Sequence, residues 1–594
     1  MLAVALPVLA AVKALVFRVF ALRDLAWRHV SFEDLPRIAS ANAVASLAAA
    51  GALRWSIGPA FPRSIYILDL LLSMALMTAA RAGARVVCEY RRRTRDPGGG
   101  STAPRRILIY GAGSAGVRIV AELRAHRSLA LTPVGFIDDD PYKRNLRLGG
   151  LRVVGTGAQL RSEVKRHGAV EVLVAIPAAT GPQMARILEH CRDAEVTARK
   201  IPALAEWIGT RGLLDQIREV RLEDLLGRAA VKIQEQEIRS ILTGKAVLVT
   251  GAGGSIGGEL CRQIARCRPA VLVGVEHAEN ALYRMEQEMK EMFPAFPFVA
   301  ELASIQHAPR MREVFSRHEP FAVYHAAAYK HVPMMEHHPF DAVENNVFGT
   351  ANTVNAAVEC GTQIFVLVSS DKAVRPSNIM GATKRMAELV CLAETGGSGV
   401  RPDARFLAVR FGNVLGSNGS VIPLFQRQIA GGGPVTVTHP DMRRFFMTVP
   451  EAAQLVLQAS AMSSGGEIFV LEMGDQIRIV DLARNLILLS GLKPDQIRIQ
   501  FTGVRPGEKL SEELSAIGEP TLPTTHEKIR IYPGNGIPAA ELEHALLQLR
   551  RAVDARDAGA ILLCLKETIP EYNPSNLLLR RAFGPRSLGV AAAV

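Results

Sequence analysis

Apolar residues are distributed differently in the first 85 residues of the chain and in the remainder. Three long apolar stretches come first, over residues 1–22, 38–53 and 64–80. Beyond residue 106 the apolar runs shorten to between four and seven residues, and stretches with helical periodicity separate them. This pattern predicts a helical N-terminus followed by an α/β architecture in the rest of the chain.

The three N-terminal stretches are candidate membrane-spanning helices, which need about 20 mostly apolar residues. Lys13, Arg18 and Asp69 interrupt them, so amphipathic or buried helices of a soluble protein are the alternative. A basic cluster, of the kind that marks the cytoplasmic side of a membrane, follows the third stretch: Arg81, Arg85, Arg91, Arg92, Arg93 and Arg95. We predict about three transmembrane helices in residues 1–85 that contact membrane lipid. The protein would be a multi-pass inner-membrane protein with its catalytic domain in the cytoplasm.

A first nucleotide-binding pattern follows a basic linker predicted over residues 86–106, which ends in a Gly- and Pro-rich segment. A strand over 107–110 runs into Gly111-Ala-Gly113-Ser-Ala-Gly116, and further strands are predicted at 134–137 and 170–176. Glycines between a strand and a helix let a pyrophosphate approach the helix N-terminus. We predict a Rossmann-like, CoA-binding-like middle domain over 107–225. Nucleotide binding and purely structural packing of a strand against a helix both stay open for it.

The second glycine pattern is more specific. A strand over 246–250 leads into Gly251-Ala-Gly253-Gly254-Ser-Ile-Gly257 and a helical run over 259–267. The next strand, over 270–275, ends at Glu276, nineteen residues after Gly257, which is close to the spacing of an acid that binds an adenosine ribose. An acid at this position repels a 2′-phosphate and therefore favours NAD over NADP.

The alternation of strands and helices continues with predicted strands at 322–325, 364–369 and 406–410. This order indicates a doubly wound parallel sheet, in which ligands bind at the carboxyl ends of the strands. Three polar segments directly follow these strands, at residues 329–331, 369–372 and 410–413. We therefore expect a catalytic domain over 226–594 whose site lies at that edge of the sheet.

Composition narrows the class of protein. The chain has 594 residues, 48% hydrophobic and 21% charged, which excludes both a disordered chain and a transporter with many spans. The net charge of +13 is explained in part by the basic cluster near residue 90, and we expect no nucleic-acid partner because no such binding motif is present. The seven cysteines include no C-x-x-C, so neither a disulfide framework nor a metal site is expected.

Five segments in order carry a family resemblance: VTGAGGSIG (249–257), HAAAYKHVPMME (325–336), SDKAVRPSNIMGATK (370–384), RFGNVLG (410–416) and RPGEK (505–509). Together they resemble the membrane-bound polysaccharide-biosynthesis nucleotide-sugar 4,6-dehydratases, which are extended short-chain dehydrogenase/reductase proteins similar to UDP-N-acetylglucosamine 4,6-dehydratase. The resemblance covers essentially the whole chain. It implies a bound NAD, a UDP-sugar substrate and a C-terminal substrate-binding part.

The resemblance also implies a mechanism. NAD oxidises C4 of the sugar, a base removes the C5 proton, an acid protonates the departing C6 hydroxyl, and the hydride returns to C6. By resemblance Asp371 is the acid and Lys372 the base, and these roles call for a raised pKa of Asp371 and a lowered pKa of Lys372. Ser370 is expected to hydrogen-bond O4 or to relay its proton.

One catalytic position departs from the usual pattern of related dehydrogenases. They have Tyr-x-x-x-Lys on a helix, whereas this chain has Met380-Gly-Ala-Thr-Lys384. Methionine transfers no proton, so the acceptor of the O4 proton stays unassigned, while Lys384 is expected to hold the nicotinamide ribose. A second departure is Ala303-Ser304-Ile305, where relatives often have Gly-Asp, which puts the adenine contact in doubt.

The remaining site residues follow from the same motifs. The residues expected to bind the cofactor are Gly251, Gly254, Ser255, Ile256, Gly257, Glu276, Ala326, Ala327, Lys330 and Lys384. Asn413 is expected to hold a phosphate or the sugar, and Glu508 the uridine ribose. Three arginines, Arg443, Arg444 and Arg505, can neutralise the diphosphate.

The sequence therefore predicts a membrane-anchored, NAD-dependent UDP-N-acetylhexosamine 4,6-dehydratase that makes a 4-keto-6-deoxy sugar for a surface glycan. A nucleotide-sugar 4-epimerase on the same scaffold is one alternative, and the adjacent Asp371 and Lys372 argue against it. A non-catalytic membrane sensor of nucleotide sugars is another, supported only by Met380. A homo-oligomer is expected.

Overall fold

The computed structural model describes residues 2–19, 35–57, 63–94, 105–125, 130–177, 179–201, 218–225, 234–393, 403–492, 495–514, 521–532 and 536–584. Contacts divide the chain into two units. The first comprises Met1–Pro104 with His126–Ala130, and the second comprises Arg105–Ala125 with Leu131–Val594.

The first unit contains three helices at the positions of the three apolar stretches: α1 (Leu2–Val19), α2 (Leu35–Ile57) and α3 (Arg63–Thr94). α2 packs against both α1 and α3. Two of the charged residues that interrupt the stretches meet each other, since Lys13 Nζ lies 2.6 Å from Asp69 Oδ1. Ser46 Oγ donates a hydrogen bond to Asp69 Oδ2 at 2.9 Å. These contacts link all three helices.

The prediction of helices at these positions is confirmed, but the prediction that they span a membrane is not supported. Within the part of the chain that the structure describes, no helix has the length and apolar character needed to cross a membrane. The predicted linker over 86–106 begins inside α3, and its residues 95–104 lie outside the described residues.

The second unit begins with a seven-stranded sheet in the order β3-β4-β2-β1-β5-β6-β7. Strands β4, β2, β1, β5 and β6 run parallel, while β3 and β7 pair antiparallel at the two edges. The strands are β1 (Arg105–Tyr110), β2 (Leu131–Ile137), β3 (Arg147–Leu148), β4 (Leu151–Gly155), β5 (Glu171–Val174), β6 (Thr197–Lys200) and β7 (Arg218–Glu219), and the helices are α4 (Ser114–Ala125), α5 (Leu160–His167), α6 (Gly181–Asp193) and α7 (Leu222–Leu225). The three strands predicted here are confirmed, as is the Rossmann-like parallel arrangement.

A nine-stranded sheet follows, in the order β10-β9-β8-β11-β12-β13-β18-β22-β21. The first seven strands are parallel, β22 runs antiparallel to β18, and β21 runs antiparallel to β22. The strands are β8 (Ala246–Thr250), β9 (Val271–Glu276), β10 (Phe298–Leu302), β11 (Ala322–His325), β12 (Ile364–Val368), β13 (Arg405–Arg410), β18 (Ile468–Leu471), β21 (Leu522–Pro523) and β22 (Ile529–Tyr532). The predicted doubly wound parallel sheet is confirmed.

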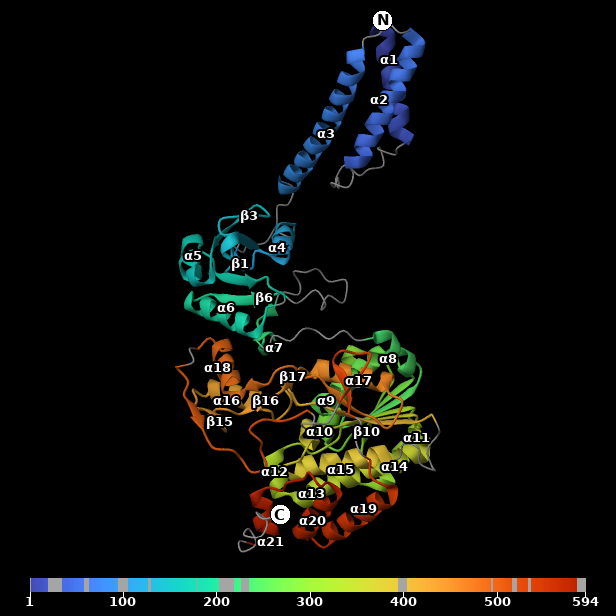
Figure 1. The fold of residues 1–594 in the computed structure, drawn as a ribbon, viewed down its shortest axis with the longest axis vertical. Coiled ribbons are helices and arrows are strands. Elements are labelled where there is room, and N and C mark those ends of the chain that lie inside the picture. Colours follow the sequence, from blue (N-terminus) through green and yellow to red (C-terminus); the bar gives the residue numbers. More distant parts are fainter. Residues whose placement is uncertain are drawn as a thin grey trace. The chain divides into compact units, whose positions relative to one another are not determined.

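Helices cover both faces of this sheet (Figure 1). Alternate residues of the strands point to opposite faces, so Val247 and Val249 of β8 pack against α9, α10 and α17, while Leu248 packs against α11, α14 and α15. The helices are α8 (Glu235–Leu242), α9 (Ser255–Arg266), α10 (Glu279–Met292), α11 (Ala308–His318), α12 (Val332–His337), α13 (Pro339–Val343), α14 (Gly349–Cys360), α15 (Ile379–Ala393) and α17 (Val449–Met462). This sandwich holds the carboxyl ends of the strands in one row.

Two smaller groups of elements flank the sheet. Three short strand pairs with α16 and α18 form one group, and three C-terminal helices that pack against α12, α13 and α15 form the other (Figure 1). The first group comprises β14 (Asn413–Val414), β15 (Val435–Val437), β16 (Arg443–Arg444), β17 (Phe446–Met447), β19 (Ile477–Arg478), β20 (Ile499–Phe501), α16 (Val421–Ala430) and α18 (Ile479–Leu489), and the second α19 (Ala539–Asp554), α20 (Ala558–Thr568) and α21 (Asn576–Phe583).

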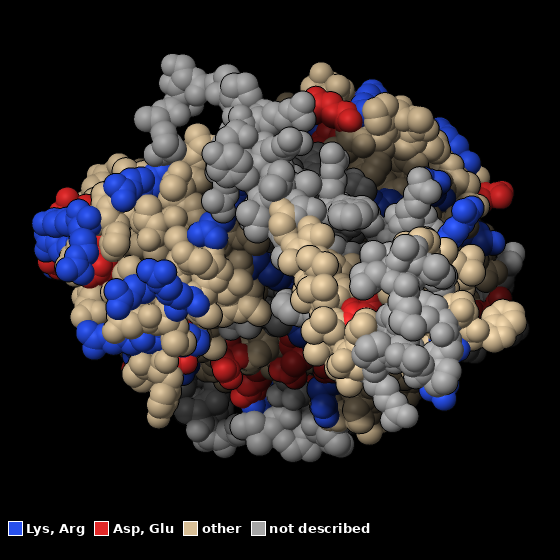
Figure 2. Space-filling view, turned by 90° about the horizontal axis from the view of Figure 1, so that it is seen from above, with Lys and Arg blue, Asp and Glu red and all other residues tan. Residues whose placement is uncertain are grey.

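Charge is spread rather than concentrated on the one face of the molecule that Figure 2 shows. On the face that Figure 2 shows, Lys and Arg side chains form several separate groups, with Asp and Glu between some of them. The net charge of +13 is therefore not gathered into one continuous basic area among the described residues visible there.

Candidate active site

The glycine-rich loop between β8 and α9 is closed by contacts that only glycine allows. A Cβ on Gly257 would lie 2.0 Å from the carbonyl oxygen of Gly251, and one on Gly251 would lie 2.8 Å from the backbone nitrogen of Ala327. Gly251 also has a φ of +68°, which L-residues rarely adopt. The loop therefore packs tightly against both the start of α9 and the end of β11.

A pocket opens beside this loop, and five of the predicted cofactor residues line it: Gly251, Gly254, Glu276, Ala326 and Ala327. Ala303, Ser304 and Ile305, the segment that departs from the family pattern, line it as well. The Glu276 carboxylate lies at the end of β9 and accepts hydrogen bonds from the backbone N–H groups of Gly253 (3.2 Å) and Ala278 (3.0 Å). The pocket is thus a concave site whose lining includes two glycines of the loop, Gly251 and Gly254, and one acid, Glu276.

The other predicted cofactor residues have different surroundings. Ser255 begins α9, and its Oγ accepts a hydrogen bond from the backbone N–H of Asn418 at 3.0 Å. Ile256 packs against the apolar core beneath the sheet, and Gly257 packs against the loop. Lys330 is exposed on the segment that follows β11, one residue beyond Tyr329 of the pocket lining.

Helix α15 carries Met380 and Lys384 one turn apart. Met380 is buried in the apolar core, so its thioether contributes packing. Lys384 is also buried, and its Nζ donates a hydrogen bond to the carbonyl oxygen of Val368 at the end of β12, at 2.6 Å. Burial lowers the pKa of Lys384 to about 8, although the Glu388 carboxylate opposes the shift. A lysine of this kind changes charge close to neutral pH.

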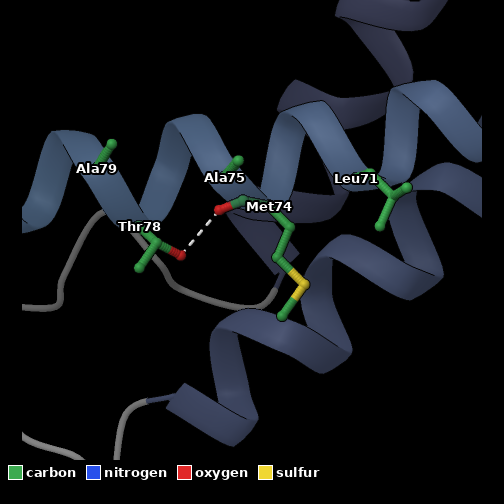
Figure 3. A pocket seen from close by; sticks show the side chains of 5 residues that line it. All are labelled: Leu71, Met74, Ala75, Thr78 and Ala79. Carbon is green, nitrogen blue, oxygen red and sulfur yellow. Dashed lines mark hydrogen bonds between the residues drawn. The ribbon is translucent and has the colours of Figure 1, made fainter.

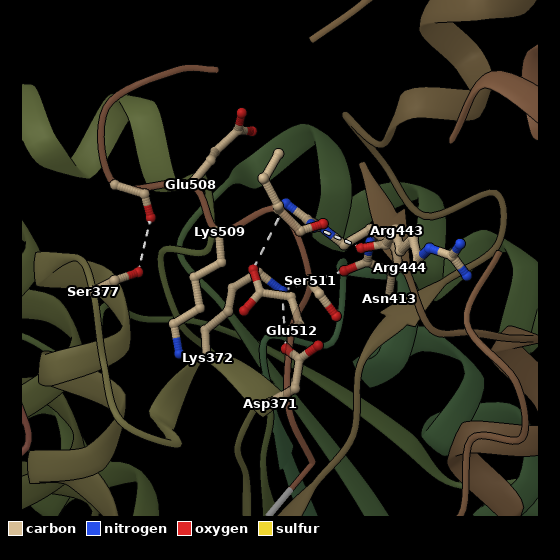
Figure 4. Close-up of polar contacts among 12 residues, drawn as sticks. Asp371, Lys372, Ser377, Asn413, Arg443, Arg444, Glu508, Lys509, Ser511 and Glu512 are labelled. Atoms are coloured by element: carbon tan, nitrogen blue, oxygen red, sulfur yellow. Dashed lines mark hydrogen bonds and ion pairs between the residues drawn. The ribbon is translucent and has the colours of Figure 1, made fainter. Parts of the chain in front are cut away.

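Asp371 and Lys372 lie in η8 (Asp371–Ala373), a short helical turn directly after β12 (Figure 4). Lys372 Nζ donates a hydrogen bond to Asp371 Oδ1 at 2.9 Å, and Ser370 Oγ donates to the same oxygen at 2.9 Å. The other oxygen of Asp371 is buried and has no hydrogen-bond partner among the described residues. The pair therefore keeps one carboxylate oxygen available for a further donor.

The expected lowering of the Lys372 pKa is wrong. Burial alone would lower it, but the negative charges of Asp371 and Glu512 outweigh that effect and raise the pKa of Lys372 above its ordinary value. The prediction rested on the role of Lys372 as a base, and the sequence did not place a second carboxylate, Glu512, beside the lysine.

Two of the predicted substrate residues lie beside this pair. Asn413 follows β13, and its Oδ1 accepts a hydrogen bond from Lys372 Nζ at 3.3 Å. Arg444 is buried, donates to the carbonyl oxygen of Leu510 at 3.3 Å, and places Nη2 3.7 Å from Glu512 Oε1. The segment over 505–512 is thereby attached to the strand pair that presents Arg444.

The other substrate residues are more exposed. The backbone N–H of Arg443 donates to the carbonyl oxygen of Leu510 at 2.8 Å. The side chain of Arg443 is exposed. Arg505 and Glu508 pair with each other, since Arg505 Nε lies 3.1 Å from Glu508 Oε1. Figure 4 shows Glu508 projecting away from the Asp371–Lys372 pair. The structure therefore brings Asn413 and Arg444 to the pair, and Arg505 and Glu508 to each other.

The sequence interpretation did not single out several buried polar residues near the site. Glu388 on α15 is fully buried and accepts hydrogen bonds from Arg410 at 2.7 and 2.6 Å and from Ser369 Oγ at 2.6 Å. Arg410 begins the RFGNVLG motif and Ser369 begins the polar segment over 369–372, so a buried partner acid could have been sought on the intervening helix. Glu512 follows the RPGEK motif by three residues, and only the folded chain brings it to Lys372.

No metal site was predicted, and within the described ranges no group of three or more His, Cys, Asp or Glu side chains could hold a metal ion. At this edge of the sheet, the buried pair of Lys372 and Asp371 can accept and donate protons, and the pocket lined by the glycine-rich loop lies at the same edge.

Comparisons with known proteins give two family matches. The family described as "Polysaccharide biosynthesis protein" matches residues 247–533, and the family described as "CoA-binding domain" matches residues 25–202. The first match contains the pocket, the Asp371–Lys372 pair and the segment over 505–512.

Three relatives illustrate the similarity. "Probable polysaccharide biosynthesis protein EpsC" of Bacillus subtilis (strain 168) is 47% identical over 414 residues, which cover 69% of this chain and 68% of that protein. "Capsular polysaccharide biosynthesis protein CapD" of Staphylococcus aureus is 40% identical over 513 residues, covering 86% and 84%. A Campylobacter jejuni "UDP-N-acetylglucosamine 4,6-dehydratase (inverting)" is 31% identical over 280 residues, covering 45% and 76%. Proteins called UDP-glucose 4-epimerase match a shorter part of the chain.

The family expected from the five motifs is therefore confirmed. The chain belongs to the polysaccharide biosynthesis protein family, whose members are nucleotide-sugar dehydratase- and epimerase-like proteins of the extended short-chain dehydrogenase/reductase type.

Proposed function

We propose that the protein is an NAD-dependent UDP-N-acetylhexosamine 4,6-dehydratase that makes a 4-keto-6-deoxy nucleotide sugar for a surface glycan. The observation that carries the proposal is the hydrogen-bonded pair of Asp371 and Lys372, held in η8 at the carboxyl end of β12. A relative with this activity in its name supports the sugar and the reaction. In this proposal residues 107–225 form a middle domain and residues 226–594 the catalytic domain.

The pocket beside the glycine loop fits a dinucleotide. The contacts of Gly251 and Gly257 leave no room for a Cβ, and α9 begins at Ser255 with its free N–H groups next to the loop. Glu276 would hold the adenosine ribose hydroxyls, and Lys384 the nicotinamide ribose. NAD bound there would supply a hydride acceptor for C4 and return the hydride to C6.

The residues of the chain would then carry out the elimination of water. The C5 proton becomes acidic once C4 is a ketone, and the Lys372 amine takes it while Asp371 donates a proton to the departing C6 hydroxyl. For these roles Lys372 must start as a neutral amine and Asp371 as a protonated carboxylic acid, whereas their hydrogen-bonded pair is ordinarily an ammonium and a carboxylate. Moving one proton along the 2.9 Å hydrogen bond from Nζ to Oδ1 produces both forms at once.

The protons of the cycle balance with these roles. Oxidation of C4 releases the O4 proton to solvent, and the elimination adds one proton to Lys372 and removes one from Asp371, so the two side chains, 2.9 Å apart, end as ammonium and carboxylate. Reprotonation of C5 by Lys372 and of Asp371 by solvent returns the pair to its starting protonation. Asn413 would orient the Lys372 ammonium, and Arg444 with Arg443 and Arg505 would face the diphosphate.

Incubation with UDP-N-acetylglucosamine, without added NAD, tests the proposal by proton NMR. A new C6 methyl signal together with a C4 ketone or its hydrate is the expected result. A sugar inverted at C4 that keeps its C6 hydroxyl would instead identify an epimerase. An epimerase has no need for an acid at C6, so the carboxylate of Asp371 favours the dehydratase.

We also propose that the first unit associates with a lipid bilayer. Seven large apolar side chains of α3 are exposed, whereas the charged Lys13 and Asp69 are largely buried between the helices. The seven are Ile65, Ile67, Leu68, Leu71, Leu72, Met74 and Leu76. Leu71, Met74 and Thr78 project from one side of α3 and line a shallow apolar pocket with Ala75 and Ala79 (Figure 3). Apolar side chains outside and charged ones inside are the distribution that a lipid environment favours.

Flotation of the full-length protein with lipid vesicles tests this second proposal. The protein is expected in the vesicle fraction, and a Leu68→Ser, Leu72→Ser variant is expected to shift toward the unbound fraction. Protein that stays unbound with both neutral and anionic vesicles would overturn it. The expected homo-oligomer is likewise a proposal, which sedimentation of the purified protein would test.

A further inference from the structure

Glu512 is a buried carboxylate at the end of the segment over 505–512. Its side chain is 3% exposed, its backbone carbonyl accepts a hydrogen bond from Gln476 Nε2 at 2.6 Å, and its Oε1 lies 3.7 Å from Arg444 Nη2. Figure 4 shows it between the Asp371–Lys372 pair and Arg444. A carboxylate is rarely buried in this way without a charged partner, and the partners here belong to the candidate active site.

The charges around Glu512 come from three elements. Lys372 and Asp371 face it from η8, Arg444 faces it from β16, and Lys509 lies on its own segment. Burial raises the pKa of Glu512 even though the attraction of Lys372 opposes this, and the proximity of Asp371 raises it further. Lys372 experiences the reverse effect, because both carboxylates stabilise its ammonium form.

We propose that Glu512 is a positioning residue that stabilises the ammonium form of Lys372 and so makes Lys372 a stronger base. In the elimination the C5–H bond breaks, its electron pair stays on the sugar next to the C4 ketone, and the proton joins the Lys372 amine. A negative charge beside that amine stabilises the ammonium as it forms. This inference rests on the proposed dehydratase function, and Glu512 acts in it through Lys372 without touching the sugar.

The first test measures the basicity of Lys372 in the full-length protein, independently of turnover. Reductive methylation with formaldehyde, followed by mass spectrometry, reports the neutral fraction of each lysine as a function of pH. Glu512→Gln removes the charge and keeps the shape, so the midpoint for Lys372 is expected to fall by about one pH unit. Glu512→Asp keeps the negative charge, so its Lys372 midpoint is expected to lie close to that of the wild type.

Glu513→Gln is the matched control, because Glu513 is the next residue and pairs with Arg375 away from Lys372. Its Lys372 midpoint is expected to equal that of the wild type. Glu512→Ser provides a second neutral variant of smaller volume in case Glu512→Gln fails to fold. An unchanged midpoint in the folded neutral variant would overturn the inference.

The second test is kinetic. Glu512→Gln is expected to lower kcat about tenfold and to slow exchange of the C5 proton with D2O, while KM for the UDP-sugar stays within about twofold. A merely structural role would lower activity without moving the Lys372 midpoint, and that outcome would also overturn the inference. If the wild type makes no 4-keto-6-deoxy sugar, the proposed function fails, and the methylation midpoint still decides the role of Glu512 toward Lys372.

Discussion

Asp371 and Lys372 meet because the chain tightens into η8 directly after β12, where Ser370 Oγ accepts a hydrogen bond from the Lys372 N–H. Neighbouring residues in an extended strand would point to opposite faces of the sheet. Their pairing could therefore be predicted from adjacency together with a turn. The raised pKa of Lys372 could not be predicted from the sequence, because it depends in part on Glu512, which reaches the pair only in the folded chain.

Replacing either member of the pair tests its chemical role. Asp371→Asn and Lys372→Met are each expected to lower kcat for dehydration by about 10²- to 10⁴-fold, because each removes one proton-transfer group. NAD content should not change, since the glycine loop is untouched. Lys290→Met, in the exposed Lys290–Glu286 pair of α10, is the control and should keep wild-type activity. A residual rate within tenfold of wild type for either active-site variant would contradict the assignment.

At the scale of elements, one buried ion pair helps to hold α15, in addition to its apolar contacts with the core. Glu388 on this helix binds Arg410 at the end of β13 through two hydrogen bonds, and it lies one turn beyond Lys384. The pair fixes the helix against the strand next to β12. Its geometry therefore positions both Lys384 and the core side chain of Met380.

Breaking this pair is expected to destabilise the fold. Glu388→Gln leaves the Arg410 guanidinium buried without its carboxylate, which costs about 3–5 kcal/mol of unfolding free energy. Chemical denaturation monitored by circular dichroism gives the value. Glu313→Gln, in the exposed Glu313–Arg317 pair of α11, should change stability by less than about 1 kcal/mol. Equal effects of the two substitutions would refute the role given to Glu388.

The same pair predicts a direction of pH dependence. Burial would raise the pKa of Glu388, but the Arg410 charge outweighs it and lowers the pKa from 4.5 to about 2. A carboxylate whose pKa is lower in the folded state contributes stability above the unfolded value and loses it as pH falls. The free energy of unfolding of the wild type should fall as the pH is lowered from about 4.5 to 2. The contribution of Glu388 to this fall should be absent in Glu388→Gln.

The glycine loop allows a prediction with an internal control. Gly257→Ala would place a Cβ 2.0 Å from the Gly251 carbonyl oxygen, so the loop must open and NAD retention should be lost. Gly258→Ala would place a Cβ 3.3 Å from the nearest atom, the carbonyl oxygen of Ala252, and should be tolerated inside the helix. The NAD content of the purified proteins, read by absorbance after denaturation, checks both. Retention of NAD by Gly257→Ala would show that the loop does not hold it.

The strands of the catalytic domain were the easiest elements to predict. Short apolar runs bounded by glycine or polar residues gave β8 and β11 with their observed ends and β12 to within one residue. Helix ends were less accurate, since α3 continues to Thr94, beyond the apolar stretch, where polar residues still favour helix. Contacts such as those of Glu388 and Glu512 could not be predicted, because they join segments that only the fold brings together.

At the scale of the whole molecule, the chain combines an α/β unit with a separate helical unit, whose inner polar contacts the apolar pattern did not predict. Lys13, Ser46 and Asp69 come from three different helices, and the sequence analysis treated Lys13 and Asp69 only as interruptions of the apolar stretches. Their contact indicates that these interruptions specify how the three helices pack.

A double-mutant cycle tests this coupling. Lys13→Leu or Asp69→Leu alone leaves one largely buried charge without its partner, so each is expected to lower the unfolding temperature of the helical unit. The double variant should recover much of the loss, which gives a coupling energy of about 0.5–3 kcal/mol. Thermal unfolding of the full-length protein in the presence of lipid vesicles measures it. Strictly additive effects would mean that the two side chains do not interact.

The fate of the hydrogen on C4 separates dehydration by internal redox from epimerisation. UDP-N-acetylglucosamine deuterated at C4 is incubated with the full-length protein and no added NAD, and the product is examined by proton and deuterium NMR. We expect a 4-keto sugar whose C6 carries a CH2D group, because the hydride taken from C4 returns to C6 after water leaves. A product that keeps its C6 hydroxyl with deuterium at an inverted C4, or a C6 methyl group without deuterium, would contradict this expectation.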